Sequence, residues 1–212
     1  MNMNTYWHER FTRTGLSFKG AGHSGWTERE NILSHLDAWA MVKEDLGKYQ
    51  RSSIVEVGVG NGFYTKLLLA NGATFVYGLD ICPVLFPLIR TLVIDVKDRD
   101  RCILAEHDIT SEKDQIIFSD SLPAPEAAIM IDVEQHILDD AAIIRAMKKI
   151  MSWLPKTGRL VFTCHCVPNR NTILNDHEVC RTFQFYRDIF DGLGCSITDP
   201  IPFRGKFLLT AG

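Results

Sequence analysis

One stretch of the chain decides its fold: Ile54-Val55-Glu56-Val57-Gly58-Val59-Gly60-Asn61-Gly62-Phe63-Tyr64-Thr65. An apolar run leads through glycines at alternate positions into a segment with helical character. Such a turn brings the backbone close to a ligand and directs free N–H groups at the ligand's anionic part. The stretch therefore predicts a cofactor-binding loop between a strand and a helix. Glycines that serve only the geometry of a tight turn are the alternative interpretation.

The spacing of these glycines distinguishes between two kinds of ligand. The dinucleotide fingerprint is G-x-G-x-x-G, with the pyrophosphate at the helix N-terminus. Here the third glycine comes one residue early, at Gly62, and the strand carries an acid near its end, Glu56. A carboxylate repels a pyrophosphate and attracts an ammonium group. These residues favour a zwitterionic ligand over a dinucleotide.

Outward from the loop, short apolar runs alternate with helix-like segments, which indicates a parallel sheet. The predicted strands are Ile54–Val57, Phe75–Leu79, Cys102–Leu104, Ala127–Ile131 and Arg159–Thr163. Helices are expected at Tyr64–Ala70, Pro83–Val96, Leu138–Trp153 and around Glu178–Phe190. Two last runs, Ser196–Ile201 and Lys206–Thr210, are separated by Pro202-Phe203-Arg204-Gly205 and predict a hairpin. The expected fold class is α/β: a Rossmann-like doubly wound sheet, mostly parallel, with an antiparallel C-terminal hairpin strand.

The N-terminal part follows a different pattern. Residues 1–26 mix aromatic, basic and glycine residues without a regular period, which predicts a loop or a short helical arm. At Thr27 a Ser/Thr-x-x-Glu capping box, completed by Glu30, opens a helix that should end at Gly47. We therefore expect one domain in two parts. Residues 1–50 form an arm and capping helix that act as a lid, and residues 51–212 form the cofactor-binding sheet.

Composition limits the partners. The 212 residues carry 23 Lys and Arg against 26 Asp and Glu, a net charge of −3, and 46% of them are hydrophobic. This composition is typical of a globular domain, and without a concentrated basic excess it argues against a nucleic-acid partner. No window has the roughly 18–20 apolar residues of a membrane span, and the N-terminus lacks the apolar core of a signal peptide. We expect no membrane partner and a cytoplasmic location.

The cysteines are expected to be reduced thiols. There are six, but a chain of this length builds a core without disulfides. Cys164, Cys166 and Cys180 lie near His165 and His177 in the sequence, yet their spacing matches no zinc-binding pattern. The sequence therefore predicts no metal.

Together, four segments and the glycine loop resemble one protein family. The apolar-apolar-acid-apolar-G-x-G-x-G pattern resembles motif I of the class I S-adenosylmethionine-dependent methyltransferases. Segments similar to that family's later motifs follow in the same order across residues 53–163. They are Tyr77-Gly78-Leu79-Asp80, Ala105-Glu106-His107-Asp108-Ile109, Asp132-Val133-Glu134-Gln135-His136-Ile137 and Leu154-Pro155-Lys156-Thr157-Gly158-Arg159-Leu160-Val161-Phe162. The resemblance implies S-adenosylmethionine as cofactor and methyl transfer as activity.

The resemblance also implies which residues hold each part of the cofactor. It implies that Glu56 and the backbone of Gly58, Gly60 and Gly62 bind the methionine moiety. Asp80 would bind the ribose hydroxyls, Ile81 would pack on the adenine ring, and Asp108 would accept from the adenine amino group. Asp132 would lie near the methyl donor. Each assignment has a plainer alternative. Asp80 and Asp108 are also typical strand-end caps, Ile81 a core residue, and Asp132 a helix N-cap.

Methyl transfer is an in-line displacement, so alignment and exclusion of water matter most, and a base is needed only when the acceptor must lose a proton. His136 is the candidate base, because it follows the fourth strand at the carboxyl edge of the sheet, where ligands of open α/β folds bind. The alternative is a histidine that closes the pocket or donates to a backbone carbonyl. His165 follows the fifth strand at the same edge and is a candidate substrate ligand.

The arm supplies the other candidate substrate ligands, Trp7, Arg10 and Lys19, whose aromatic and basic side chains suit an anionic or sugar-like acceptor. Equally, the aromatic residues would anchor the arm to the core. The leading hypothesis is O- or N-methylation of a small-molecule acceptor. A protein- or RNA-directed methyltransferase and a non-catalytic S-adenosylmethionine-binding protein are the alternatives.

Overall fold

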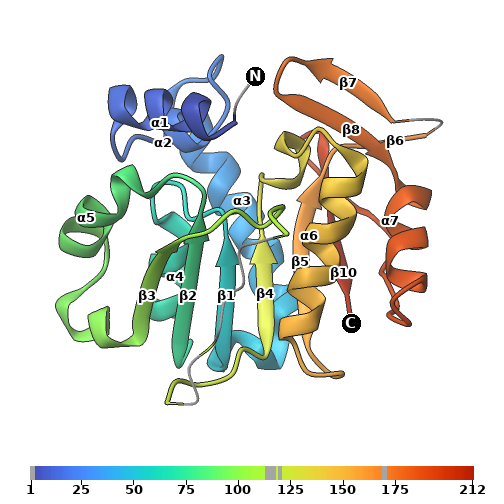
Figure 1. The fold of residues 1–212 in the computed structure, drawn as a ribbon. Helices are drawn as coiled ribbons and strands as arrows, with labels where there is room; N and C mark the ends of the chain where they lie inside the picture. Colours follow the sequence, from blue (N-terminus) through green and yellow to red (C-terminus); the bar gives the residue numbers. More distant parts are fainter. Residues whose placement is uncertain (1–2, 113–117, 119–120, 169–170) are drawn as a thin grey trace.

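The computed structural model describes residues 3–112, 118, 121–168 and 171–212 (Figure 1). Its main sheet has seven strands in the order β3-β2-β1-β4-β5-β10-β9. Their bounds are β1 Ser53–Val57, β2 Phe75–Asp80, β3 Cys102–Glu106, β4 Ala127–Met130, β5 Arg159–Cys164, β9 Ile201–Phe203 and β10 Lys206–Ala211. The strands β3, β2, β1, β4 and β5 are parallel, whereas β10 pairs antiparallel with β5 and with β9. The predicted α/β fold with an antiparallel C-terminal hairpin strand is confirmed.

Helices cover both faces of this sheet, because successive side chains of a strand point to opposite sides. Ile54 of β1 lies in a buried cluster with α3 (Glu28–Leu46) and α4 (Phe63–Ala70). The next residue, Val55, lies in a second cluster with α6 (Asp140–Trp153) and α7 (Phe183–Asp191). The carboxyl ends of β1, β2 and β4 consequently meet at one edge of the sheet (Figure 1).

The N-terminal arm is helical and lies over that edge. Two helices, α1 (Met3–Thr14) and α2 (Phe18–Ala21), cross above the carboxyl ends of the central strands (Figure 1). Arg10 of α1 is buried, and its guanidinium donates to the carbonyl oxygens of Lys19 and Gly22, which ties the two helices together. The predicted capping box of Thr27 is present at the start of α3.

One predicted helix was placed too early. The segment around Glu178–Phe190 starts as a strand, β8 (Glu178–Thr182), which joins β6 (Cys166–Val167) and β7 (Thr172–Asn175) in a second, three-stranded sheet. The helix α7 begins only at Phe183, where the hydroxyl of Thr182 accepts from the N–H of Phe185 at 3.2 Å. The strand pairs with the neighbouring β7 and β6, and Arg181 within it forms ion pairs with the distant Glu134 and Asp140.

Two further segments differ from expectation. The predicted helix Pro83–Val96 is broken into η2 (Pro83–Leu85), α5 (Phe86–Leu88) and η3 (Ile89–Val93), followed by η4 (Val96–Arg101). Two prolines without N–H groups interrupt the hydrogen-bond ladder there. At the C-terminus the hairpin strand is β9 rather than Ser196–Ile201, and of that segment Ile201 begins β9 while Ile197 forms an isolated bridge to Ala211 of β10. Its two-residue turn has positive φ at both residues, Arg204 and Gly205, as tight hairpins require.

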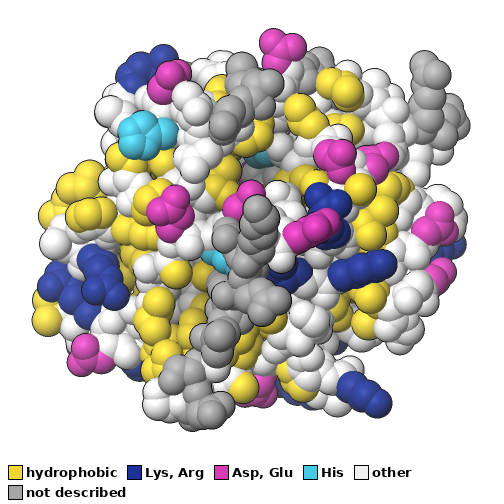
Figure 2. Space-filling view, viewed as in Figure 1, with side chains coloured by type: hydrophobic (Ala, Val, Ile, Leu, Met, Phe, Trp, Pro, Cys, Tyr) yellow, Lys and Arg dark blue, Asp and Glu magenta, His cyan; other side chains and the backbone are white. Residues whose placement is uncertain are grey.

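The surface has mixed character. On the face in Figure 2, Lys and Arg are interspersed with Asp and Glu, and apolar side chains gather over α5. Leu88, Leu92 and Val96 are 42%, 69% and 74% exposed in this region. Among the described residues, no helix is both long enough and apolar enough to cross a membrane.

Candidate functional site

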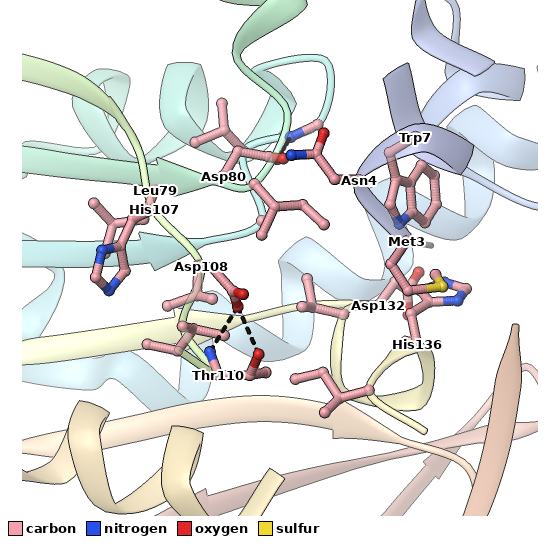
Figure 3. A pocket seen from close by; sticks show the side chains of 18 of the residues that line it. Met3, Asn4, Trp7, Leu79, Asp80, His107, Asp108, Thr110, Asp132 and His136 are labelled. Carbon is pink, nitrogen blue, oxygen red and sulfur yellow. Dashed lines mark hydrogen bonds between the residues drawn. The ribbon is translucent and has the colours of Figure 1, made fainter. Parts of the chain in front are cut away.

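A cavity of about 1040 Å³ lies between the carboxyl edge of the sheet and α1. Figure 3 shows Asp80 and Asp108 on one side of it, and Trp7, Asp132 and His136 on the other. The structure thus brings together residues from α1 and from the carboxyl ends of β2, β3 and β4. The predicted site residues that line the cavity are Trp7, Gly58, Gly60, Asp80, Ile81, Asp108, Asp132 and His136, whereas Arg10, Lys19, Glu56, Gly62 and His165 do not.

The glycine loop has the backbone that its sequence predicts. Gly58, Gly60 and Gly62 all have positive φ, at 83°, 55° and 80°. At Gly58 a Cβ atom would come within 2.1 Å of the Val133 side chain, so only glycine fits there. Gly62 lies outside the cavity lining and packs on Ile89, where a Cβ atom would come within 2.8 Å. The third glycine serves the turn and its packing, while the first two face the cavity.

Asp80 is held rigidly at the end of β2. Its Oδ2 accepts from the N–H of Gly60 at 2.9 Å, and its Oδ1 accepts from the N–H of Cys82 at 2.9 Å. Burial raises the pKa of this carboxyl, against the lowering effect of the backbone N–H groups. The carboxylate therefore links the glycine loop to β2 and presents remaining lone pairs to the cavity.

Asp108, after β3, caps its own turn. Its Oδ1 accepts from the N–H and the hydroxyl of Thr110 at 2.9 and 2.6 Å (Figure 3). The cap predicted as the alternative role is therefore present, although the residue also lines the cavity. His107 lines the cavity as well and was not predicted from the sequence.

Asp132, after β4, has the unusual backbone of a constrained residue, with φ at 58°. Its N–H donates to the Thr163 hydroxyl at 2.7 Å, and its Oδ1 lies 2.6 Å from Nζ of Lys206. Burial opposes its charge, but the Lys206 ammonium holds its pKa at about 2. The following turn, η5 (Glu134–His136), has no side-chain cap, so Asp132 is not the helix N-cap considered as the alternative.

His136 lines the cavity with a fixed ring. Its Nδ1 lies 2.8 Å from the carbonyl oxygen of His177, so Nδ1 carries the proton and Nε2 is left as the acceptor. Trp7 meets the ring edge-on at a centroid distance of 5.0 Å. Burial lowers the pKa of His136 to about 4, so the imidazole is neutral at pH 7. The alternative interpretation, a histidine that donates to a backbone carbonyl, is therefore present. The same His136 also faces the cavity.

The basic residues predicted to bind substrate lie elsewhere. Arg10 is bound to backbone carbonyls of the arm, and the exposed Lys19 follows it in α2. His165 is half-buried beyond the cavity lining, and burial lowers its pKa. Of the arm residues predicted to bind substrate, only Trp7 lines the cavity.

Two buried polar atoms near the loop lack partners. Glu56 is 1% exposed, and its Oε2 accepts from the Thr65 hydroxyl, but its Oε1 has no hydrogen-bond partner among the described residues. The hydroxyl of Tyr64, which lines the cavity, also lacks one within the described chain. Burial raises the pKa of Glu56 to about 8, despite the bond from Thr65. Unpartnered buried polar atoms indicate a missing polar ligand. Of the two residues, only Tyr64 lines the cavity, so its hydroxyl oxygen is the one that a ligand with an ammonium group can reach there.

The cysteines form no disulfide. Sγ of Cys164 and Sγ of Cys166 lie 3.1 Å apart. Within the described ranges, no group of three or more His, Cys, Asp or Glu side chains is placed to hold a metal ion.

Comparison with known proteins identifies the fold. No family model and no curated protein matches the sequence. Among solved structures, the chain is similar to magnesium protoporphyrin IX methyltransferase (ChlM) from Synechocystis PCC 6803 with bound SAM, at 17% identity and a TM-score of 0.69, covering 100% of this chain and 97% of that one. It is also similar to DhpI, described as a DhpI-SAM-HEP complex, at 14% identity and a TM-score of 0.66, covering 98% and 94%. A third is the glycopeptide N-methyltransferase MtfA, at 14% identity and a TM-score of 0.57, covering 76% and 82%. The chain therefore has the class I methyltransferase fold.

Proposed function

We propose that the protein is an S-adenosylmethionine-dependent methyltransferase that acts on a small-molecule acceptor. The observation that carries the proposal is the link between Asp80 and Gly60, which sets a ribose-binding carboxylate against a glycine loop at the cavity wall. The cavity, at about 1040 Å³, lies at the upper end of the roughly 300–1,000 Å³ usual for one ligand. It leaves room for an acceptor beside the cofactor. ChlM and DhpI, which share the fold, are described with SAM bound.

The cofactor would lie with its nucleoside toward Asp80 and Asp108 and its methyl group toward Asp132 and His136. Ile81 lines the cavity next to Asp80, in the place for the adenine ring. Gly58 and Gly60, which line the cavity, would hold the methionine moiety. The Asp132 carboxylate, charged at neutral pH, favours a nearby sulfonium.

When bound, S-adenosylmethionine supplies an electrophilic methyl group on a sulfonium. The chain's own residues align the acceptor and exclude water, and α1 closes the cavity with Trp7. Neutral His136, oriented by the carbonyl of His177, presents Nε2 for the proton of an O–H or N–H acceptor. The charged Asp132 raises the proton affinity of His136 as the proton arrives. Its low pKa makes His136 a weak base, which suits proton removal as the new bond forms.

The roof over the cavity favours a small acceptor over a polymer. Met3, Asn4, Trp7 and Phe11 of α1 all line the cavity, so an RNA or protein segment would have to displace the helix. The interspersed charges in Figure 2 also give little support to a nucleic-acid partner. We keep the cytoplasmic location expected from the sequence as part of the proposal.

The test is methyl transfer from S-adenosylmethionine labelled in the methyl group. The protein is incubated with a size-fractionated metabolite extract, and we expect label in an organic small-molecule fraction. Asp80→Ala should abolish cofactor binding in a parallel titration, and His136→Ala should reduce transfer more than binding. Binding of S-adenosylmethionine without transfer to any fraction would instead favour a non-catalytic binding protein. Label recovered only in protein or RNA would favour a macromolecular acceptor.

A further inference from the structure

Tyr64 is a cavity residue to which the proposed function assigns no role. It lies in the first turn of α4, directly after the glycine loop, and is 7% exposed. Its hydroxyl is buried without a hydrogen-bond partner among the described residues, yet its side chain lines the cavity. A buried hydroxyl without a partner is destabilising, so proteins rarely retain one unless a ligand satisfies it.

Neighbouring rings hold the Tyr64 side chain in place. His35 of α3 stacks on it at a centroid distance of 5.7 Å and an interplanar angle of 21°. Nδ1 of His35 lies 2.8 Å from the carbonyl oxygen of Asn31, which fixes the orientation of the stacked ring. Phe63 meets Tyr64 edge-on at a centroid distance of 5.1 Å and also contacts His35 at 5.6 Å. The hydroxyl therefore has a defined position on the cavity wall.

The charges around this hydroxyl are negative. Burial raises the pKa of Tyr64 well above its usual value, and the carboxylates of Asp132 and Glu56 raise it further. The Glu56 carboxyl contributes the second unpartnered atom, Oε1. The charged Asp132 carboxylate, which lines the same cavity, repels an anionic group and favours a cationic donor beside the Tyr64 hydroxyl.

We propose that the Tyr64 hydroxyl oxygen accepts a hydrogen bond from the ammonium group at the amino-acid end of S-adenosylmethionine, and so selects ligands that carry this group. The inference rests on the proposed function, because it concerns the same cofactor. It extends that function by naming a residue that distinguishes the cofactor from nucleosides without an amino-acid end. The ammonium has three N–H donors, and the Tyr64 hydroxyl on the cavity wall accepts from one of them.

Three ligands and one variant test this assignment. S-adenosylhomocysteine carries the ammonium and the carboxylate, 5′-(3-aminopropylthio)-5′-deoxyadenosine carries the ammonium alone, and 5′-methylthioadenosine carries neither. Calorimetric titration should give a dissociation constant about tenfold or more higher in Tyr64→Phe for the first two ligands, because a hydrogen bond to a charged group is lost. Affinity for 5′-methylthioadenosine should be unchanged.

Tyr77→Phe is the matched control, since the Tyr77 hydroxyl donates to the carbonyl oxygen of Pro123 at 2.7 Å, away from the cavity lining. It should leave all three affinities unchanged. Without ligand, Tyr64→Phe should melt at the wild-type temperature or above it, because the variant removes a buried group that has no partner.

Different results would separate the two proposals. An equal loss for all three ligands, a loss for S-adenosylhomocysteine alone, or no loss at all would each overturn the role of Tyr64. If wild-type protein bound none of the three, the proposed function itself would fail.

Discussion

Asp132 has a constrained backbone and a carboxylate paired with Lys206, so its charge depends on one contact. We predict that Lys206→Met lowers the free energy of unfolding at pH 7 by about 2–3 kcal/mol. The native pKa of about 2 lies below the unfolded value of about 3.9, so this stability is present above pH 4 and is lost as pH falls toward 2. Denaturant unfolding should show that the free energy of unfolding changes less between pH 7 and pH 3 in the variant than in the wild-type protein.

Arg204→Met is the control for that experiment. Arg204, in the turn between β9 and β10, pairs with Asp37 of α3, but the two side chains are 39% and 50% exposed. Exposed ion pairs contribute about 0–1 kcal/mol to the free energy of unfolding. A similar loss in both variants would contradict the special role of the Lys206 pair.

Glu56 shows the opposite pH dependence. Its native pKa of about 8 lies above the value of 4.5 for a free carboxyl, because burial disfavours the charge. The stability of the protonated form is present below pH 4.5 and is lost as pH rises toward 8. We predict that Glu56→Gln removes this loss. The free energy of unfolding of the variant, relative to wild type, should then rise by about 1 kcal/mol or more for each pH unit between the two pKa values. It should also bind S-adenosylhomocysteine more weakly, and parallel slopes for the two proteins would contradict the assignment.

Sequence predicted those site residues whose position follows from a strand end. Asp80, Asp108 and Asp132 come directly after strands, so their arrival at one edge follows from the parallel sheet. Tyr64 was missed, because an unpartnered hydroxyl is visible only when the surrounding elements are in place. Arg10 was assigned to substrate from its charge, but its guanidinium binds two carbonyls of the arm.

At the scale of elements, β8 and η5 are joined by a buried ion cluster. Arg181 is fully buried and lies 3.2 Å from Oε2 of Glu134 and 2.8 Å from Oδ1 of Asp140. The hydroxyl of Tyr186 donates to the same Glu134 oxygen at 2.6 Å. Because η5 also carries His136, the cluster positions the candidate base.

We predict that Arg181→Met lowers the free energy of unfolding by about 3–5 kcal/mol, because it leaves the Glu134 carboxylate buried without its cation. Adding Glu134→Gln should restore part of the loss, since it removes the stranded charge. Thermal and denaturant unfolding of the two variants would measure both effects. Additive losses in the double variant would contradict the coupling.

The same cluster explains why the second sheet was not predicted. An arginine between Cys180 and Thr182 gives no sign of burial in the sequence, since its partners Glu134 and Asp140 are distant along the chain. The parallel strands, by contrast, are buried on both faces and appear as continuous apolar runs. Local pattern therefore predicted the main sheet, whereas β8 is held by a buried arginine whose ion-pair partners are distant along the chain.

At the scale of the whole molecule, α1, which lines the cavity, is in contact with the turn between β7 and β8. Tyr6 of α1 stacks on His177, next to β8, at a centroid distance of 4.9 Å, and His177 stacks in turn on His136 at 5.8 Å. Trp7 and His136, which contact each other, both line the cavity, so a ligand that packs on them favours the arrangement in which α1 meets this turn. The helix and the β7–β8 hairpin should therefore become ordered together.

We predict that S-adenosylhomocysteine slows hydrogen exchange in residues 3–14 and 172–182 to a similar degree, as measured by mass spectrometry. At a ligand concentration about a hundredfold above the dissociation constant, binding stabilises the bound form by about 3 kcal/mol. Any opening of a segment that requires release of the ligand becomes rarer by the corresponding factor. Helix α7 is the internal control, because its buried residues belong to the second cluster, whereas those of α1 belong to the first. Tyr6→Ala should uncouple the two segments, leaving protection at the glycine loop. Protection confined to that loop in the wild-type protein would contradict joint closure, since the roof would then move independently of the ligand below it.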